Sequence, residues 1–208
     1  MARLKNGILG GITGKIGNIE GYMLNGEYII RSRRRKSTKP PTEKQVASRQ
    51  RIKAANHFLH PILEFAKVGF EYIALTRKSR ACNIATSYLV KDAIEGETID
   101  YSKVRLSEGP INTQDINASV VKEVDNLIFT WTPDLSYAHG NDHVMLLAYT
   151  PELNEAVYTL CGAKRSAGID TLKLPDDSWK GKTIEIYLSF KAENSILCGN
   201  SLYLGQII

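Results

Sequence analysis

The residues with the clearest chemical potential are cations that crowd one short segment. Six of them fall within nine positions: Arg31, Arg33, Arg34, Arg35, Lys36 and Lys39. Three more follow a little further along: Arg49, Arg51 and Lys53. Such a run can neutralise phosphates and would give a salt-dependent affinity for DNA or RNA. The same charge can protect an edge strand or dock on an acidic protein surface. The segment therefore predicts a contact surface, for protein or for nucleic acid.

The charge of the whole chain is unevenly distributed. Residues 1–60 hold thirteen Lys or Arg against three acids, whereas residues 101–208 hold nine against thirteen. A basic beginning followed by a mildly acidic remainder is typical of proteins that contact a partner through one end. We infer no small-molecule substrate from the sequence.

Two groups of potential metal ligands are interpreted as structural. They are His57, His60 and Glu64 in the first group, and His139, Asp142 and His143 in the second. The first is not a His-Glu-x-x-His pattern, and Pro61 interrupts its helix, which favours solvated or capping roles. The second falls in a predicted turn. No nucleophile elbow, paired-carboxylate motif or kinase signature is present. We expect no enzymatic activity, no metal and no cofactor.

The cysteines and the N-terminus bear on the compartment. Cys82, Cys161 and Cys198 are odd in number and far apart, which predicts buried free thiols. Glycines interrupt the first residues before a signal-peptide core can form. No apolar run approaches the ~20 residues that cross a bilayer. We expect a cytoplasmic or particle-associated protein without a signal peptide.

The beginning of the chain is rich in glycine and leads into a predicted β-hairpin over residues 16–35. Its turn is Asn25-Gly26, a dipeptide favoured where both central positions need positive φ. A phosphate-binding loop is disfavoured, because the glycines precede a strand and no Lys-Ser/Thr follows them. We expect an interaction arm that becomes ordered by contact with other backbone. Its residues are Gly7, Gly10, Gly11, Gly14, Gly17, Tyr22 and Tyr28.

The remainder predicts an α+β protein. A capping-box pattern at Thr42 and Gln45 predicts a helix that ends near His60, and a second helical stretch covers about residues 80–94. From about residue 99 the apolar period changes from 3.6 to 2, which divides the chain into residues 1–98 and 99–208. The second part has the rhythm of an immunoglobulin/fibronectin-III-like β-sandwich, with Trp131 between its sheets. Its strands are expected at 102–106, 116–124, 127–132, 143–149, 155–161, 171–174, 183–190 and 201–207.

Several motifs together resemble one family. They are Lys5-Asn-Gly-Ile-Leu-Gly-Gly-Ile-Thr-Gly-Lys-Ile-Gly-Asn18, Asn25-Gly-x-Tyr-x-x-Arg-Ser32, Lys39-Pro-Pro-Thr-Glu-Lys-Gln45 with Arg49, Asn83-x-Ala-x-Ser-Tyr88, Ile99-Asp-Tyr-Ser-Lys-Val104, Phe129-Thr-Trp131 and Asn200-Ser-x-Tyr-x-Gly205. The chain resembles, over essentially its whole length, the Bacteroidota family called domain of unknown function 6266. The resemblance supplies no activity and no catalytic residues.

These observations predict a non-enzymatic structural or protein-interaction module. We expect it to self-associate or to bind a protein partner, as a subunit of a larger phage-derived or surface assembly. The alternative is a nucleic-acid-binding protein that uses residues 31–53.

Overall fold

The computed structural model describes residues 3–4, 10–24, 26–34, 38–113, 115–175 and 177–208. Contacts divide the chain into an N-terminal unit, residues 1–42, and a C-terminal unit, residues 43–208. The sequence predicts a division at residue 98/99 instead. That division concerns which parts of the chain fold independently, and it stays a prediction. Gly7, Arg35 and Lys36 lie outside the described residues.

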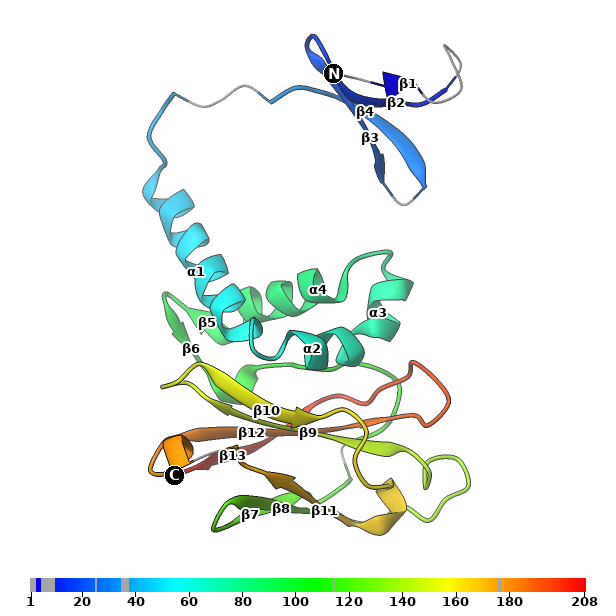
Figure 1. The fold of residues 1–208 in the computed structure, drawn as a ribbon, viewed down its shortest axis with the longest axis vertical. Coiled ribbons are helices and arrows are strands. Elements are labelled where there is room, and N and C mark those ends of the chain that lie inside the picture. Colours follow the sequence, from blue (N-terminus) through cyan, green and yellow to red (C-terminus); the bar gives the residue numbers. More distant parts are fainter. Residues whose placement is uncertain (1–2, 5–9, 25, 35–37, 114, 176) are drawn as a thin grey trace. The chain divides into compact units, whose positions relative to one another are not determined.

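The N-terminal unit is a four-stranded antiparallel sheet (Figure 1). Its strands follow one another in the order β1 (Arg3–Leu4), β2 (Ile12–Ile16), β3 (Ile19–Leu24) and β4 (Glu27–Ser32). Leu24 pairs with Glu27, so a two-residue turn joins β3 to β4, and Gly26 adopts a φ of 86° there. The hairpin predicted around Asn25-Gly26 is confirmed.

The C-terminal unit begins with helices. They are α1 (Glu43–Leu59), α2 (Leu63–Gly69), α3 (Glu71–Thr76) and α4 (Ala81–Tyr88), which continues as the π-helix η2 (Leu89–Ala93). Helix α1 ends at Leu59, which confirms the helix end predicted before Pro61. A proline cannot continue the helical hydrogen bonds, because it has no backbone N–H. The second predicted helical stretch corresponds to α4 with η2. Helices α2 and α3 were not distinguished in the sequence.

Strands occupy the rest of the C-terminal unit. A small hairpin, β5 (Ile94–Glu95) and β6 (Thr98–Ile99), precedes two antiparallel sheets. One sheet has the order β10-β9-β12-β13 and the other β11-β8-β7. Their bounds are β7 (Ser119–Glu123), β8 (Asn126–Thr130), β9 (His143–Thr150), β10 (Glu155–Thr159), β11 (Ile169–Lys173), β12 (Ile184–Lys191) and β13 (Leu202–Ile207).

One predicted strand is wrong. Within residues 102–106 the structure has the end of a 3-10 helix, η3 (Tyr101–Lys103), followed by irregular backbone. The side chain of Asp100 accepts a hydrogen bond from the backbone N–H of Ser102. Such a local bond competes with strand pairing, which explains the error. Each of the other seven predicted strand segments contains a strand.

The central strands β9 and β12 are buried on both faces. Alternate residues of β12, namely Ile184, Ile186, Leu188 and Phe190, belong to the cluster between the two sheets. Trp131 lies in the same cluster, with its ring 5.7 Å from that of Phe190. The mixed helix and strand class is confirmed, and Figure 1 shows the C-terminal unit as helices over one sheet, with the second sheet beneath.

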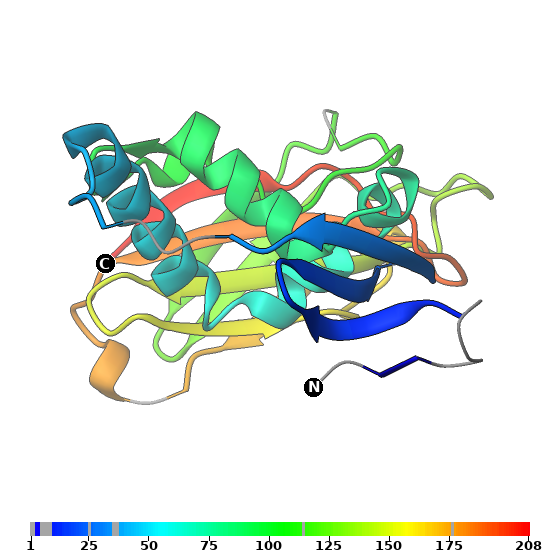
Figure 2. The ribbon, with the colours of Figure 1, turned by 90° about the horizontal axis from the view of Figure 1, so that it is seen from above.

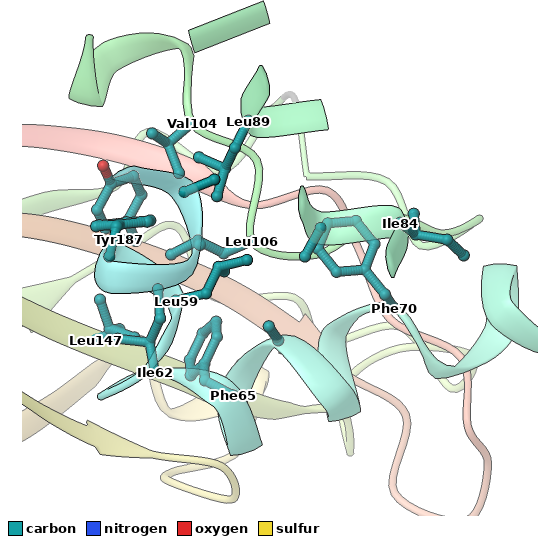
Figure 3. Close-up of a cluster of buried hydrophobic side chains, with 14 of the residues drawn as sticks. Leu59, Ile62, Phe65, Phe70, Ile84, Leu89, Val104, Leu106, Leu147 and Tyr187 are labelled. Atoms are coloured by element: carbon teal, nitrogen blue, oxygen red, sulfur yellow. The ribbon is translucent and has the colours of Figure 1, made fainter. Parts of the chain in front are cut away.

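A second cluster fills the space between helices and sheet. From above, the helices cross the strands of the β10-β9-β12-β13 sheet (Figure 2). Figure 3 shows Leu59, Ile62 and Phe65 pointing toward Leu147 and Tyr187. All five side chains are buried. The helices therefore complete the core of this unit and do not form a separate one.

Candidate protein-interaction surface

The pairing of β2, β3 and β4 determines which side chains share a face. Directly opposed residues of an antiparallel sheet point to the same side, and neighbours along a strand point to opposite sides. Ile16 pairs with Ile19, Gly21 with Ile30, and Met23 with Tyr28. One side, which we call the apolar face, therefore carries Gly14, Ile16, Ile19, Gly21, Met23, Tyr28, Ile30 and Ser32.

The apolar face is largely open to solvent. Its exposed fractions are 44% for Ile16, 45% for Ile19, 52% for Met23, 43% for Tyr28 and 57% for Ile30. Neither buried hydrophobic cluster of the described chain includes a residue of the N-terminal unit. A sheet normally covers its apolar face with another layer. Residues 11 and 12 lie against part of this face, at Tyr28 and Gly21, and within the described part of its own unit the rest of the face has no covering layer.

Glycines shape this face from within. A Cβ on Gly11 would overlap the ring of Tyr28, and one on Gly21 would overlap the carbonyl oxygen of Ile12. Both glycines therefore permit close backbone approach inside the N-terminal unit. Gly14 lies in β2 and Gly17 in the β2–β3 turn, both with positive φ, and Gly10 directly precedes this region.

The opposite side, which we call the charged face, carries Lys15, Glu20, Tyr22, Leu24, Glu27, Ile29 and Arg31. Arg31 Nη2 lies 3.1 Å from Glu20 Oε2, and its guanidinium lies 5.0 Å from the ring centre of Tyr22. Arg31 is thus already engaged within its own sheet. The two tyrosines predicted for the interaction arm are separated, since Tyr22 is on the charged face and Tyr28 on the apolar face.

The other predicted cations fall in both units. Arg33 and Arg34 follow β4 and are exposed, and the backbone N–H of Arg33 donates to the carbonyl of Asn18 at 2.7 Å. Lys39 also belongs to the N-terminal unit, whereas Arg49, Arg51 and Lys53 lie on α1 of the C-terminal unit. The seven of these cations that the structure describes therefore do not belong to a single structural element.

The C-terminal unit has a polar cleft of about 540 Å³. Arg105 and Glu108 line it, and the guanidinium groups of Arg77 and Arg105 lie 5.7 and 5.0 Å from the ring centre of Tyr88. Burial, aided by the Glu108 carboxylate, raises the pKa of Tyr88. Arg77 lies 3.9 Å from Glu108, and Arg105 lies 3.3 Å from Asp92. Both cations are therefore balanced by carboxylates.

The predicted structural histidines make separate local contacts. His139 Nδ1 lies 3.0 Å from Asp142 Oδ2, and His143 Nδ1 lies 2.8 Å from the carbonyl of Gly162. His57 and His60 are exposed at the end of α1 and just beyond it. Among the described residues, no three His, Cys, Asp or Glu side chains are placed to hold a metal ion.

The cysteines are free, as predicted, but only one is buried. Burial raises the pKa of the Cys198 thiol to about 11. Cys82 is partly exposed and Cys161 is exposed, so the predicted burial was wrong for them. Cys161 lies two residues after the end of β10, in an exposed bend.

The sequence prediction did not include the apolar face, because its residues are separated in sequence whereas the cations are consecutive. Its signal was nevertheless present. The two-residue turn fixes the register of β3 on β4, and from that register Met23, Tyr28 and Ile30 fall on one side.

Comparisons with known proteins agree with the motifs. The chain matches the family of unknown function (DUF6266) over residues 11–205. No curated protein and no solved structure matches it. Within the described part of the chain, no helix combines the length and apolar character that a membrane crossing requires.

Proposed function

The chain belongs to the family of unknown function (DUF6266), and we propose that it is a non-enzymatic interaction protein that attaches to a protein partner through the apolar face. The observation that carries this proposal is the exposure of five large side chains on one side of a small sheet. Contiguous exposed apolar surface marks protein contacts. The partner supplies the layer that the sheet lacks.

We propose that the C-terminal unit is the structural body of the protein, with an immunoglobulin/fibronectin-III-like sandwich at its centre. Three strands, β11-β8-β7, and four strands, β10-β9-β12-β13, enclose a shared apolar cluster. Seven antiparallel strands in two sheets are typical of such sandwiches. The fold class itself assigns no activity, which is why the proposal rests on the N-terminal unit. The protein is then a subunit of a larger assembly, in which the C-terminal unit is the body and the N-terminal unit provides the attachment surface.

Sedimentation from cells tests the proposal. We would express the tagged chain in its natural host and compare it with two variants, Ile19→Thr/Ile30→Thr on the apolar face and Leu24→Thr on the charged face. Leu24 is a matched control, because it is 49% exposed and lies in the same sheet. We expect the wild type and Leu24→Thr to sediment in complexes, and the double variant to sediment more slowly. Equal, slow sedimentation of all three proteins would refute the proposal.

Nucleic-acid binding is a second candidate, supported by the exposure of Arg33 and Arg34 directly after β4. If both contact phosphates, affinity for duplex DNA falls steeply with salt. The variant Arg33→Ser/Arg34→Ser should then flatten the log–log slope by ~0.9 per lost contact. Lys173→Ser, which changes an exposed cation on β11, is the control. Undetectable DNA and RNA binding at low salt would remove this candidate.

A further inference from the structure

The exposed apolar side chains of the described chain are concentrated in one place. Sixteen large hydrophobic residues are exposed, and five of them lie on the apolar face within residues 16–30. In the C-terminal unit such residues occur in smaller groups, for example Leu75 on α3, and Val121 of β7 with Ile169 of β11, which share the outer face of one sheet. Among described residues, the surface that best complements the apolar face is therefore another copy of the same face.

We propose that the occupant of the apolar face is the apolar face of a second copy, so that two N-terminal units form a symmetric two-layer sandwich. This inference rests on the proposed function and names the partner. Two sheets that pack face to face lie about 10 Å apart and interdigitate their inner side chains. A self-complementary surface of this kind closes as a two-fold dimer.

The available area is sufficient for a weak dimer. Five large side chains, each about half exposed, would remove roughly 1,000 Å² from water when two faces meet, which is near the lower limit for a specific interface. Weak and transient complexes have interfaces of this size, so the dimer is to be sought at micromolar and higher concentrations. An unfolded N-terminal segment would not form this interface, because only the paired strands place the five side chains on one side of a sheet.

The charges are placed to permit this contact. Residues 1–42 hold nine Lys or Arg against two acids, so two N-terminal units repel one another overall. The four charges within β2, β3 and β4, namely Lys15, Glu20, Glu27 and Arg31, sum to zero and lie on the charged face, which points away from the partner, so the net repulsion comes from the other cations. Two charged faces would be separated by more than the Debye length of ~8 Å at physiological salt. Raising the salt concentration should therefore strengthen the dimer, whereas it would weaken docking on an acidic partner.

Light scattering on the purified full-length protein is the first test. The expected mass rises with concentration from that of the 23.2 kDa chain to twice that value. Ile19→Thr/Ile30→Thr should weaken the dimer by at least about tenfold, because each substitution occurs twice in the interface. Leu24→Thr should leave it unchanged. Tryptophan fluorescence reports on Trp131 and Trp179 and checks that the C-terminal unit stays folded.

Cross-linking gives a second test that does not depend on weakening the sheet. In a Cys82→Ser/Cys161→Ser background, Met23→Cys places a thiol on the apolar face and Leu24→Cys places one on the charged face. These positions are adjacent in β3 and equally exposed, at 52% and 49%. A short bismaleimide should link Met23→Cys chains into dimers and leave Leu24→Cys chains at the level of the background protein.

Three results would overturn the inference. They are a single 23.2 kDa mass at every concentration, a dimer that resists Ile19→Thr/Ile30→Thr, and equal cross-linking of the two cysteine variants. A purified monomer whose apolar face is still needed for fast sedimentation from cells would refute the dimer alone. Loss of both effects would refute the proposed function as well.

Discussion

Strands of both units place apolar side chains on both faces of a sheet, but the two units differ in whether those faces are buried. In β12 of the C-terminal unit, Leu188 faces the second sheet and Tyr187 faces the helices, and both are fully buried. In β3 of the N-terminal unit, Met23 and Leu24 also point to opposite sides, yet about half of each remains exposed. The difference lies in the layers that cover each sheet and not in the strands themselves. An alternating strand identifies a face, and only its neighbours decide whether that face is core or contact surface.

Polar groups differ in the same way. The C-terminal unit buries Arg165, which packs over the ring of Phe190 at 5.0 Å and lies 3.4 Å from Asp134. The N-terminal unit keeps its ion pair, Arg31 with Glu20, near solvent. Burial makes such groups costly to disturb, whereas exposed pairs contribute little. Stability should therefore be concentrated in the C-terminal unit.

Among the changes that test this comparison, removing the helices should have the largest effect on the stability of the C-terminal unit. The division predicted at residue 98/99 implies that a fragment 97–208 folds alone, but Met145, Leu147, Tyr149 and Tyr187 pack in the helix cluster. Without residues 43–96 these side chains lose much of their cover, so we expect no cooperative thermal unfolding. The fragment 43–208 should unfold cooperatively, close to the full-length temperature, as measured by circular dichroism. Cooperative unfolding of 97–208 would restore the division at residue 98/99.

Truncating one large side chain in each unit should sharpen the contrast. Phe65 is fully buried in the helix cluster, so Phe65→Ala should lower the free energy of unfolding of the C-terminal unit by about 3–5 kcal/mol. Met23 is half exposed in the N-terminal unit, so Met23→Ala should leave that free energy unchanged. Chemical denaturation followed by tryptophan fluorescence measures both. Comparable losses would mean that the N-terminal unit shares the main core.

Much of this architecture could be predicted from local sequence, because turns and periodicity are local properties. The Asn25-Gly26 turn, the helix end before Pro61 and the alternation of β12 all depend on neighbouring residues. Three outcomes depended on contacts between distant residues and could not be predicted in this way. They are the helices α2 and α3, the exposure of Cys161 and the shared helix and sheet cluster, to which Tyr187 and Phe65 both belong.

The candidate surface was predictable in part. The predicted basic segment adjoins the apolar face, but Arg31 contacts Glu20 and Tyr22 within its own sheet. A count of charges does not show which cations are engaged. The apolar face follows from the strand register, which the turn at Asn25-Gly26 determines. What lies over that face depends on other layers, and a single sequence does not specify them.

A buried carboxyl group in the C-terminal unit should give a smaller, pH-dependent effect. Glu185 is 3% exposed, and burial raises its pKa, although the hydroxyl of Tyr203 donates to it at 2.6 Å. The folded state therefore binds the proton of this carboxyl group more tightly than the unfolded chain does. The stability that the protonated group contributes is present at low pH and is lost as pH rises through the raised pKa. Glu185→Gln, which keeps an acceptor oxygen, should raise the unfolding temperature at pH 7 relative to wild type. The difference should shrink toward pH 4, and a constant difference at both pH values would contradict this account.

The smallest effect should come from the exposed ion pair of the N-terminal unit. Glu20→Gln removes the carboxylate 3.1 Å from Arg31 while keeping a similar shape. Exposed pairs contribute ~0.2–1 kcal/mol, and salt weakens them. Hydrogen exchange of the β3 and β4 amides should therefore accelerate by about fivefold at most at low salt, and less at high salt. Exchange in β9 and β12 should not change, since those strands open only when the C-terminal unit unfolds. Slower exchange in β9 than in β3 is expected even in the wild type. Equal protection in β3 and β9 would show that the N-terminal sheet is already covered by a stable layer.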